Sequence, residues 1–211
     1  MKITWLGHAS FQIETASGTL IRTDPYDDSI GLPVSSRRAD VVTVSHDHFD
    51  HNAVGLVPGN PVAVRNAGTT TISDVTFTGI ASFHDDKRGA SRGHNVIFVI
   101  EADGLRLAHL GDLGVRPDET QVSQIGHVDL LFVPVGGVYT IDAAAAACTM
   151  ELLRPVITVP MHYMIEGLNV PIADAKPFLR LHDNVRRARE LVITAETLPE
   201  SSEVVVLEVS P

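Results

Sequence analysis

The sequence predicts an α+β fold in which two mixed β-sheets stack as a sandwich with helices on both outer faces. Short, apolar, β-branched runs recur along the whole chain, and such runs are typical of buried strands. Helical patterns interrupt both halves of this strand-rich chain, which favours helices layered outside the sheets. Residues 95–112 repeat the plan of residues 11–24, namely strand, glycine turn, strand and aspartate. A repeat with only two copies indicates a pseudo-duplicated fold rather than a solenoid.

Glycine and proline turns divide the first half into short strands. The first strand leads into a turn of small residues at 7–10, and residues 16–18 supply a hairpin turn between the next two strands. A short helix is expected over residues 52–57, where Pro58-Gly59 would stop it. The expected strands of this half are residues 2–6, 11–14, 19–23, 40–45, 62–64, 69–72 and 74–83.

The second half contains another hairpin and the clearest helix. Residues 142–153 form an alanine run with Asp142 in its first turn, which favours a helix. A helix over residues 117–124 with Gly126 as its C-cap is also expected. Residues 174–190 place apolar side chains at helical spacing and predict an amphipathic helix. The expected strands are residues 95–101, 105–110, 128–137, 155–160, 191–194 and 204–209.

Size and composition predict one globular domain over residues 1–211. The chain has 211 residues, of which 44% are hydrophobic and 20% are charged, and this is ordinary for a domain with a sizeable core. Its net charge of -10 argues against a nucleic-acid partner, since neutralising phosphates needs a basic surplus. The single cysteine, Cys148, excludes an internal disulfide framework and fits a reducing compartment. We interpret Cys148 as a small packed hydrophobic residue.

The chain shows no targeting or spanning signal. Residues 1–5 lack the apolar core of a signal peptide, and no apolar run reaches the roughly 18 residues of a membrane span. We therefore expect a cytoplasmic protein with no membrane partner that acts on a small-molecule substrate. The sequence leaves the oligomeric state open, including a homo-oligomer.

The densest chemistry lies in residues 45–51, which read Ser-His-Asp-His-Phe-Asp-His. The spacing His-x-His-x-Asp-His indicates metal binding, because imidazole nitrogen and carboxylate oxygen are ligands that Zn²⁺ accepts. The cluster follows an expected strand, where loops on a rigid scaffold usually carry function. His46 and His48 share a face of an extended segment, and Asp50 and His51 follow as the chain turns. This arrangement suggests two ligands for each of two metals.

Three later strand ends carry further ligand types, and together they complete two metal sites of about six or seven ligands. The first site is expected to be His46, His48 and His84, the second Asp50, His51 and His162, with Asp112 as the bridge. His94 competes with His84 as the third ligand of the first metal. We favour His84 because an apolar strand delivers it, whereas His94 follows Gly93 in a loop.

Other polar residues have two interpretations each. Asp24, at a strand end before Pro25, is a turn residue or a carboxylate that orients a metal-bound histidine. His8 follows a glycine at a strand end and is a candidate for lining the cleft. His109 lies on the strand that leads to Asp112 and is either a partner that orients a ligand or a hydrogen-bonded core histidine.

The loop over residues 85–94 contains glycine and is locally basic within an acidic chain. One interpretation is a solvated, mobile loop. The other is a site edge where Arg88 and Arg92 bind an anionic group of the substrate, such as a phosphate or carboxylate.

The ligands occur in an order that resembles the metallo-β-lactamase superfamily, from Asp24 through the histidine cluster to His84, Asp112 and His162. The flanking residues are similar to a bacterial branch of small metal-dependent hydrolases related to ascorbate-6-phosphate lactonase. These flanking stretches are Leu6-Gly7-His8-Ala9-Ser10, His109-Leu110-Gly111-Asp112, Pro134-Val135-Gly136-Gly137 and Pro160-Met161-His162-Tyr163. The resemblance covers nearly the whole chain and implies a four-layer αββα sandwich with metals in a cleft at the sheet edges. It does not imply a substrate.

The expected activity is metal-dependent hydrolysis. Two divalent ions, Zn²⁺ in view of the histidine-rich ligands and Mn²⁺ or Fe²⁺ as alternatives, would lower the pKa of a bridging water and supply hydroxide. The hydroxide would cleave a small ester, lactone or phosphodiester with an anionic group. Asp50 would help to orient the nucleophile, and Tyr163 or His8 would donate a proton to an oxyanion or a leaving group.

Three other functions stay open. A di-iron redox site of the flavodiiron type could use the same ligands, but it normally requires a flavin-binding domain for which the chain has no room. A nuclease related to the RNA-processing members of the superfamily conflicts with the acidic charge and with the lack of a long inserted domain. A non-catalytic metal-binding scaffold conflicts with the completeness of the ligand set.

Overall fold

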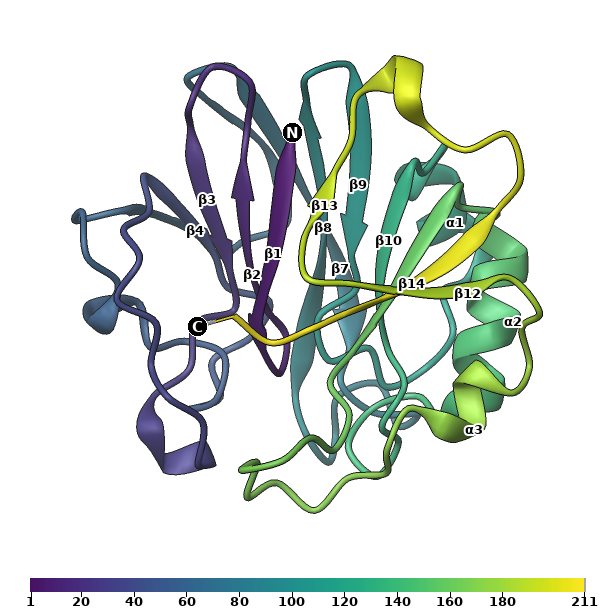
Figure 1. Cartoon of the computed structure of the whole chain (residues 1–211). Helices are drawn as coiled ribbons and strands as arrows, with labels where there is room; N and C mark the ends of the chain where they lie inside the picture. Colours follow the sequence, from purple (N-terminus) through teal and green to yellow (C-terminus); the bar gives the residue numbers. More distant parts are fainter. Residues whose placement is uncertain (211) are drawn as a thin grey trace.

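Two mixed β-sheets lie face to face in the computed structural model, which describes residues 1–210 (Figure 1). In spatial order, the six-stranded sheet contains β13 (Leu191–Val192), β1 (Lys2–Gly7), β2 (Ser10–Glu14), β3 (Leu20–Thr23), β4 (Val41–Thr43) and β5 (Val62–Val64). The eight-stranded sheet contains β12 (Val185–Ala188), β14 (Glu203–Leu207), β11 (Ile157–Met161), β10 (Leu130–Pro134), β9 (Leu105–His109), β8 (His94–Ala102), β7 (Val75–Phe83) and β6 (Gly68–Ile72). The predicted α+β sandwich is confirmed.

Each sheet combines an antiparallel hairpin with a parallel strand beside it. In the first sheet β2 pairs antiparallel with β3, and β3 pairs parallel with β4. In the second sheet β8 pairs antiparallel with β9, and β9 pairs parallel with β10. The repeat between residues 11–24 and 95–112 is therefore visible as the same strand order in the two sheets.

The core lies between the inner faces of the sheets. Phe11 on β2 and Phe132 on β10 meet across this interface with ring centroids 4.3 Å apart, and Trp5, Phe77 and Phe98 are also fully buried. Burying an aromatic side chain of this kind contributes roughly 1.5–3 kcal/mol relative to exposure. The alternation of inward and outward side chains along each strand thus fixes how the two sheets stack.

The helices pack outside the sheets. Figure 1 shows α1 (Glu119–Ile125), α2 (Ala143–Leu153) and α3 (Lys176–Leu179) on the outer side of the eight-stranded sheet. Asp118 and Asp142 cap α1 and α2 by accepting hydrogen bonds from backbone N–H groups of the first turn, as helix N-caps do. On the outer side of the six-stranded sheet, the turn η2 (Val54–Leu56) covers Val42 and Val44 through Val54 and Val57. Among residues 1–210 no helix has the length and apolar character to cross a membrane.

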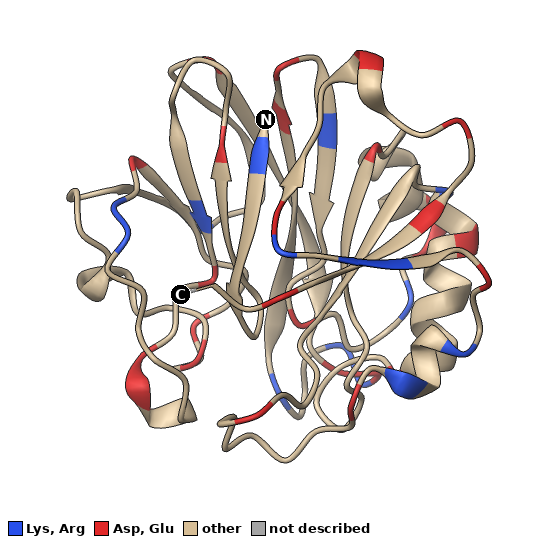
Figure 2. Ribbon diagram, viewed as in Figure 1, with Lys and Arg blue, Asp and Glu red and all other residues tan. Residues whose placement is uncertain are grey.

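The prediction of one amphipathic helix over residues 174–190 is wrong. Only one turn, α3, forms, and Val185–Ala188 becomes the edge strand β12, which pairs parallel with β14. The apolar strand β14 offers backbone hydrogen bonds to a neighbour, and Arg186 pairs with Glu203 on it through two contacts of 2.8 and 2.9 Å. Figure 2 shows that β12 is the basic edge of the sheet. Charged side chains on an edge strand also prevent pairing with other chains, so tertiary pairing overrides the helical spacing.

Candidate metal centre

All seven predicted ligands converge where β4, β7, β9 and β11 end. Asp112 follows β9 and occupies the middle of the cluster. Its Oδ2 lies 3.2 Å from Nε2 of His84, 3.2 Å from Nε2 of His162 and 3.8 Å from Nε2 of His46. Its Oδ1 lies 3.3 Å from Nε2 of His51. One carboxylate is thus within reach of four imidazoles that come from three different strand ends.

The ligand atoms form two groups on either side of Asp112. One group is His46, His48 and His84, and the other is Asp50, His51 and His162 together with His8; within each group the atoms lie within 4.8 Å of one another. This division matches the one expected from sequence, and it adds His8. The structure brings His84 to the cluster, whereas His94 is exposed and its ring lies 5.6 Å from that of Phe83.

Asp24 fixes the orientation of His51. Its carboxylate is buried and accepts hydrogen bonds from the Ser45 backbone N (2.7 Å), the Ser45 Oγ (2.6 Å) and His51 Nδ1 (3.0 Å). Because an ionised carboxylate only accepts, His51 must carry its proton on Nδ1. Nε2 faces Asp112 and is the nitrogen that would give up its proton to a metal, which is the orientation that partners of metal-bound histidines impose. Of the two interpretations of Asp24, the structure supports the orienting carboxylate.

The electrostatics keep the carboxylates of Asp112 and Asp50 ionised and favour the neutral form of His46 and His8. Burial lowers the pKa of His46 to about 3 and, reinforced by His162, the pKa of His8 to about 4. Burial alone would raise the pKa of Asp112, but its contacts with the imidazoles of His162 and His51 hold that pKa well below its ordinary value. Burial would also lower the pKa of His51, yet Asp112 and Asp24 raise it well above normal. Ionised carboxylates and neutral imidazoles are the forms that bind metal.

Several buried polar atoms of the cluster lack a protein partner. In the part of the chain that the structure describes, His46 Nε2, His51 Nε2 and Asp112 Oδ1 are buried without a hydrogen bond. Buried polar atoms are nearly always paired, and three such atoms facing the same space are what metal coordination would satisfy. Nitrogen and oxygen donors of this kind suit Zn²⁺, Mn²⁺ or Fe²⁺, so the residues fit a divalent metal centre.

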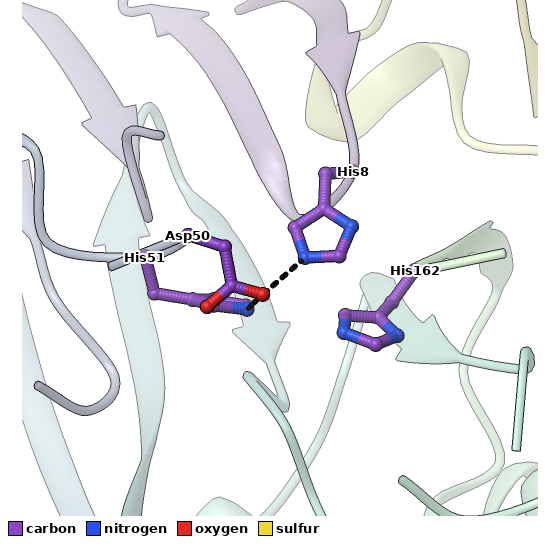
Figure 3. Close-up of side chains that lie close together, drawn as sticks. All are labelled: His8, Asp50, His51 and His162. Atoms are coloured by element: carbon purple, nitrogen blue, oxygen red, sulfur yellow. Dashed lines mark hydrogen bonds and ion pairs between the residues drawn. The ribbon is translucent and has the colours of Figure 1, made fainter. Parts of the chain in front are cut away.

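His8 contacts both Asp50 and His162 on one side of the centre (Figure 3). Its Nε2 lies 3.2 Å from Asp50 Oδ2 and must donate to that carboxylate, and its ring lies 4.2 Å from the His162 ring. The His8 carbonyl accepts hydrogen bonds from the His162 backbone N (3.1 Å) and from Trp5 Nε1 (3.0 Å). His8 adopts φ 53°, a left-handed conformation that is uncommon outside glycine. Its position therefore couples Asp50 to His162.

His109 and Tyr163 belong to the core. His109 Nε2 donates to the Ala9 carbonyl (2.9 Å), and its Nδ1 accepts from the Gly111 backbone N (3.2 Å). It is the hydrogen-bonded core histidine, and it ties the two sheets together. The Tyr163 ring packs 5.2 Å from that of Trp5, and burial raises the pKa of Tyr163 to about 12. Since the chain turns through His162 at φ 51°, the two neighbouring side chains diverge and Tyr163 does not reach the centre.

A cavity of about 420 Å³ opens onto the centre. This volume is typical of small-molecule sites. Among the described residues that line the cavity, Arg92 is present and Arg88 is not. The structure therefore brings only one of the two predicted arginines to the site. The lining residues are Ser29, Ile30, His48, Phe49, Asp50, His84, Ser91, Arg92, Asp112, Tyr139, His162, Asn169, Val170 and Pro171.

Sequence reasoning missed most of the cavity wall. Ile30 and the segment Asn169–Pro171 come from loops that carry no chemical signal of their own. Phe49 did carry a signal in the sequence. A large apolar residue between two candidate metal ligands lies in a loop at the site and is not expected to be buried in the core. Tyr139 lies two residues after the pair Gly136-Gly137, which indicates a tight loop but not where in the fold that loop lies.

Comparisons with known proteins agree with this geometry. A family model described as the beta-lactamase superfamily domain matches residues 2–162. A UPF0173 metal-dependent hydrolase of Archaeoglobus fulgidus is 30% identical over 194 residues, which cover 77% of this chain and 83% of that protein. A UPF0173 metal-dependent hydrolase of Thermococcus onnurineus is 31% identical, with 77% of this chain and 84% of that protein covered.

A solved structure is similar over its full length. It is a protein of the metallo-β-lactamase superfamily from Thermotoga maritima, proposed to be a zinc-dependent hydrolase. The two share 38% sequence identity with a TM-score of 0.83, and the match covers 98% of this chain and 97% of that one.

Proposed function

This chain belongs to the metallo-β-lactamase superfamily of metal-dependent hydrolases, and on that premise we propose that it uses two divalent metal ions, Zn²⁺ in the first instance, to hydrolyse a small ester, lactone or phosphodiester. One observation carries the proposal, namely the central Asp112 carboxylate within 3.2–3.8 Å of four imidazole nitrogens. Structural zinc sites are closed by their protein ligands, whereas this cluster borders a cavity, as catalytic sites do.

The ligands divide between the two ions as the two groups of atoms do. His46, His48 and His84 would hold one ion, Asp50, His51 and His162 the other, and Asp112 would bridge them. When bound, such ions lower the pKa of a coordinated water and polarise the substrate. Net hydrolysis joins the water oxygen to carbon or phosphorus, breaks the bond to the leaving oxygen and leaves a proton on that oxygen.

The protein's own contribution is positioning. Asp50 lines the cavity, and the hydrogen bond from His8 fixes its carboxylate. Burial would raise the pKa of Asp50, but His8 and His51 hold that pKa well below its ordinary range, so the group is an ionised acceptor that can orient a water. We therefore assign His8 to positioning Asp50, and Tyr163 takes no part in the proposed reaction because its ring lies in the core.

The test is the joint loss of metal and activity. Replacing Asp112 by alanine removes the bridge, so we expect metal content, measured by mass spectrometry on freshly purified protein, and hydrolysis of lactone and phosphodiester substrates to fall together. Asp129→Ala is a matched control, since Asp129 is a buried carboxylate far from the centre that accepts from Arg106 N and His127. A D112A variant that kept both metal and activity would overturn the bridging role.

A further inference from the structure

The cavity in front of the metal centre has a lining of two chemical kinds. The first kind consists of histidines and aspartates of the centre. The second consists of apolar residues that metal binding does not require, namely Ile30, Phe49, Val170 and Pro171, together with Tyr139. Small-molecule sites combine apolar walls with a few oriented polar groups. The apolar part of the lining therefore indicates which kind of substrate the cavity binds.

The apolar wall is held in place by contacts between two distant loops. Ile30 is buried with Tyr26 and Leu168 in a cluster separate from the main core. The Asn169 backbone N donates to the Ile30 carbonyl over 2.7 Å. At Gly31, a Cβ would lie 2.2 Å from the Gly167 carbonyl oxygen, so the two backbones are in direct contact. These contacts hold the two loops in a fixed position, so the wall is a preformed surface.

Phe49 stands at the centre with its side chain largely in solvent. It lies in the chain between His48 and Asp50 and is 59% exposed. When an apolar group of a ligand covers an exposed aromatic ring at the mouth of a cavity, the burial stabilises the complex. Packing within the protein offers no such gain here, so the ring is available to a ligand.

Arg92 is the one cation among the described residues that line the cavity. Asp85 organises its loop by accepting hydrogen bonds from four backbone N–H groups, including that of Arg92 at 2.7 Å. The guanidinium donates from Nη2 to the Val138 carbonyl (2.9 Å) and lies 5.4 Å from the Tyr139 ring centroid. This contact uses one of five N–H donors. The side chain is therefore positioned in advance, with a planar fork that suits a carboxylate.

We propose that the substrate is a small amphiphile, with an acyl or aryl group that packs on Phe49 and on Val170 and Pro171, which the buried Ile30 supports from behind, and a carboxylate that pairs with Arg92. This inference rests on the proposed hydrolase function and specifies its substrate class. A single guanidinium matches a monoanionic carboxylate in a bidentate pair, and Arg92 is the one Lys or Arg among the described residues that line the cavity.

The first test uses two esters with acyl chains of equal length, p-nitrophenyl hexanoate and mono-p-nitrophenyl adipate, on the metal-loaded protein. We expect kcat/KM to favour the adipate ester by about tenfold or more. Arg92→Gln should abolish this preference, a reduction of roughly tenfold or more, because it removes the charge-assisted pair. Arg88→Gln removes the same charge from the same loop outside the cavity and should keep the preference. A preference that survives in R92Q, or disappears in R88Q, overturns the assignment.

Phe49→Ala tests the apolar wall. It should lower kcat/KM for both esters by roughly tenfold and keep their ratio, since about 25 cal/mol of stabilisation is lost per Å² of uncovered apolar area. Metal content, measured on each variant, should stay at the wild-type value. An unchanged kcat/KM in F49A would remove Phe49 from the substrate contact. The wild-type protein could instead prefer an ester that ends in a phosphonate, and R92Q could lose that preference. This result would overturn the carboxylate as the group that pairs with Arg92 and identify a phosphate in its place.

A binding measurement separates this inference from the proposed function. If the wild-type protein hydrolyses neither ester, ester hydrolysis fails as the activity, and calorimetric titration with phenylhexanoate still decides the ligand class. Arg92→Gln should weaken the binding of phenylhexanoate roughly 10-fold or more, and Arg88→Gln should not. Equal binding by all three proteins would overturn the inference.

Discussion

Replacing Asp24 by asparagine tests how the protein prepares His51 for metal. Asp24 is completely buried and accepts three hydrogen bonds, from Ser45 N, Ser45 Oγ and His51 Nδ1. An asparagine of the same shape has one acceptor oxygen and one NH2 group with two donors. If its oxygen keeps the Ser45 backbone bond, its NH2 group faces Ser45 Oγ and His51 Nδ1. Nδ1 must then accept, so His51 keeps its proton on Nε2, which is the atom that points toward Asp112.

The size of the effect follows from these bonds. Moving the His51 proton blocks one ligand, and changing the partner of a metal-bound histidine typically costs about 10- to 100-fold in metal affinity. Hydrogen bonds to a charged group contribute about 1.5–3 kcal/mol each. Weakening two of these bonds should lower the free energy of unfolding of the metal-free protein by up to roughly 3–6 kcal/mol, the sum of their contributions.

The assay is competition for Zn²⁺ with a chromophoric chelator, alongside urea unfolding of the metal-free protein. Asp129→Asn is the matched control, because Asp129 also accepts from a backbone N–H and a histidine but lies away from the centre. We expect D129N to lose stability without losing metal affinity. If D24N bound both ions as tightly as the wild type, His51 would not depend on Asp24 for its orientation, and the reasoning would be refuted.

Three further predictions concern the surroundings of the centre. His8→Leu removes the donor to Asp50 and should weaken the binding of one ion of two by roughly 10-fold, seen as a biphasic chelator titration, whereas His8→Gln, which retains a donor, should recover part of it. Gly31→Ala places a methyl group against Gly167 O and forces a residue at φ 86°, so the melting temperature should fall by several degrees, roughly 2–4 °C for each kcal/mol, with metal content unchanged. For pH, the folded pKa of Asp24 is lowered, so its contribution to stability is present above the unfolded value near 4 and is lost as the pH falls below it; acid titration of the metal-free protein should show this loss, and a D24N variant with the same acid sensitivity would contradict it.

The site could be predicted largely from sequence because its residues carry rare chemistry at fixed places. Histidines and aspartates directly after apolar strands are delivered to one sheet edge, since strand ends in a stacked sheet converge. The prediction failed where neighbours in sequence separate in space. Tyr163 follows the ligand His162, but the left-handed turn at His162 directs it into the core. Arg88 and Arg92 share one loop, and only the hydrogen bonds to Asp85 decide which of them reaches the cavity.

The sequence by itself determined the two-sheet architecture, most strand positions and the seven histidines and aspartates that meet in the cluster, because strand periodicity and metal-ligand spacing are local properties of the chain. Only the tertiary structure decided that residues 185–188 form a strand, because the edge of β14 lies beside them. Only the tertiary structure joined Ile30 to Val170, because contacts between distant loops have no signature in either segment. The metal centre is thus encoded locally, whereas the surface that selects its substrate exists only in the folded chain.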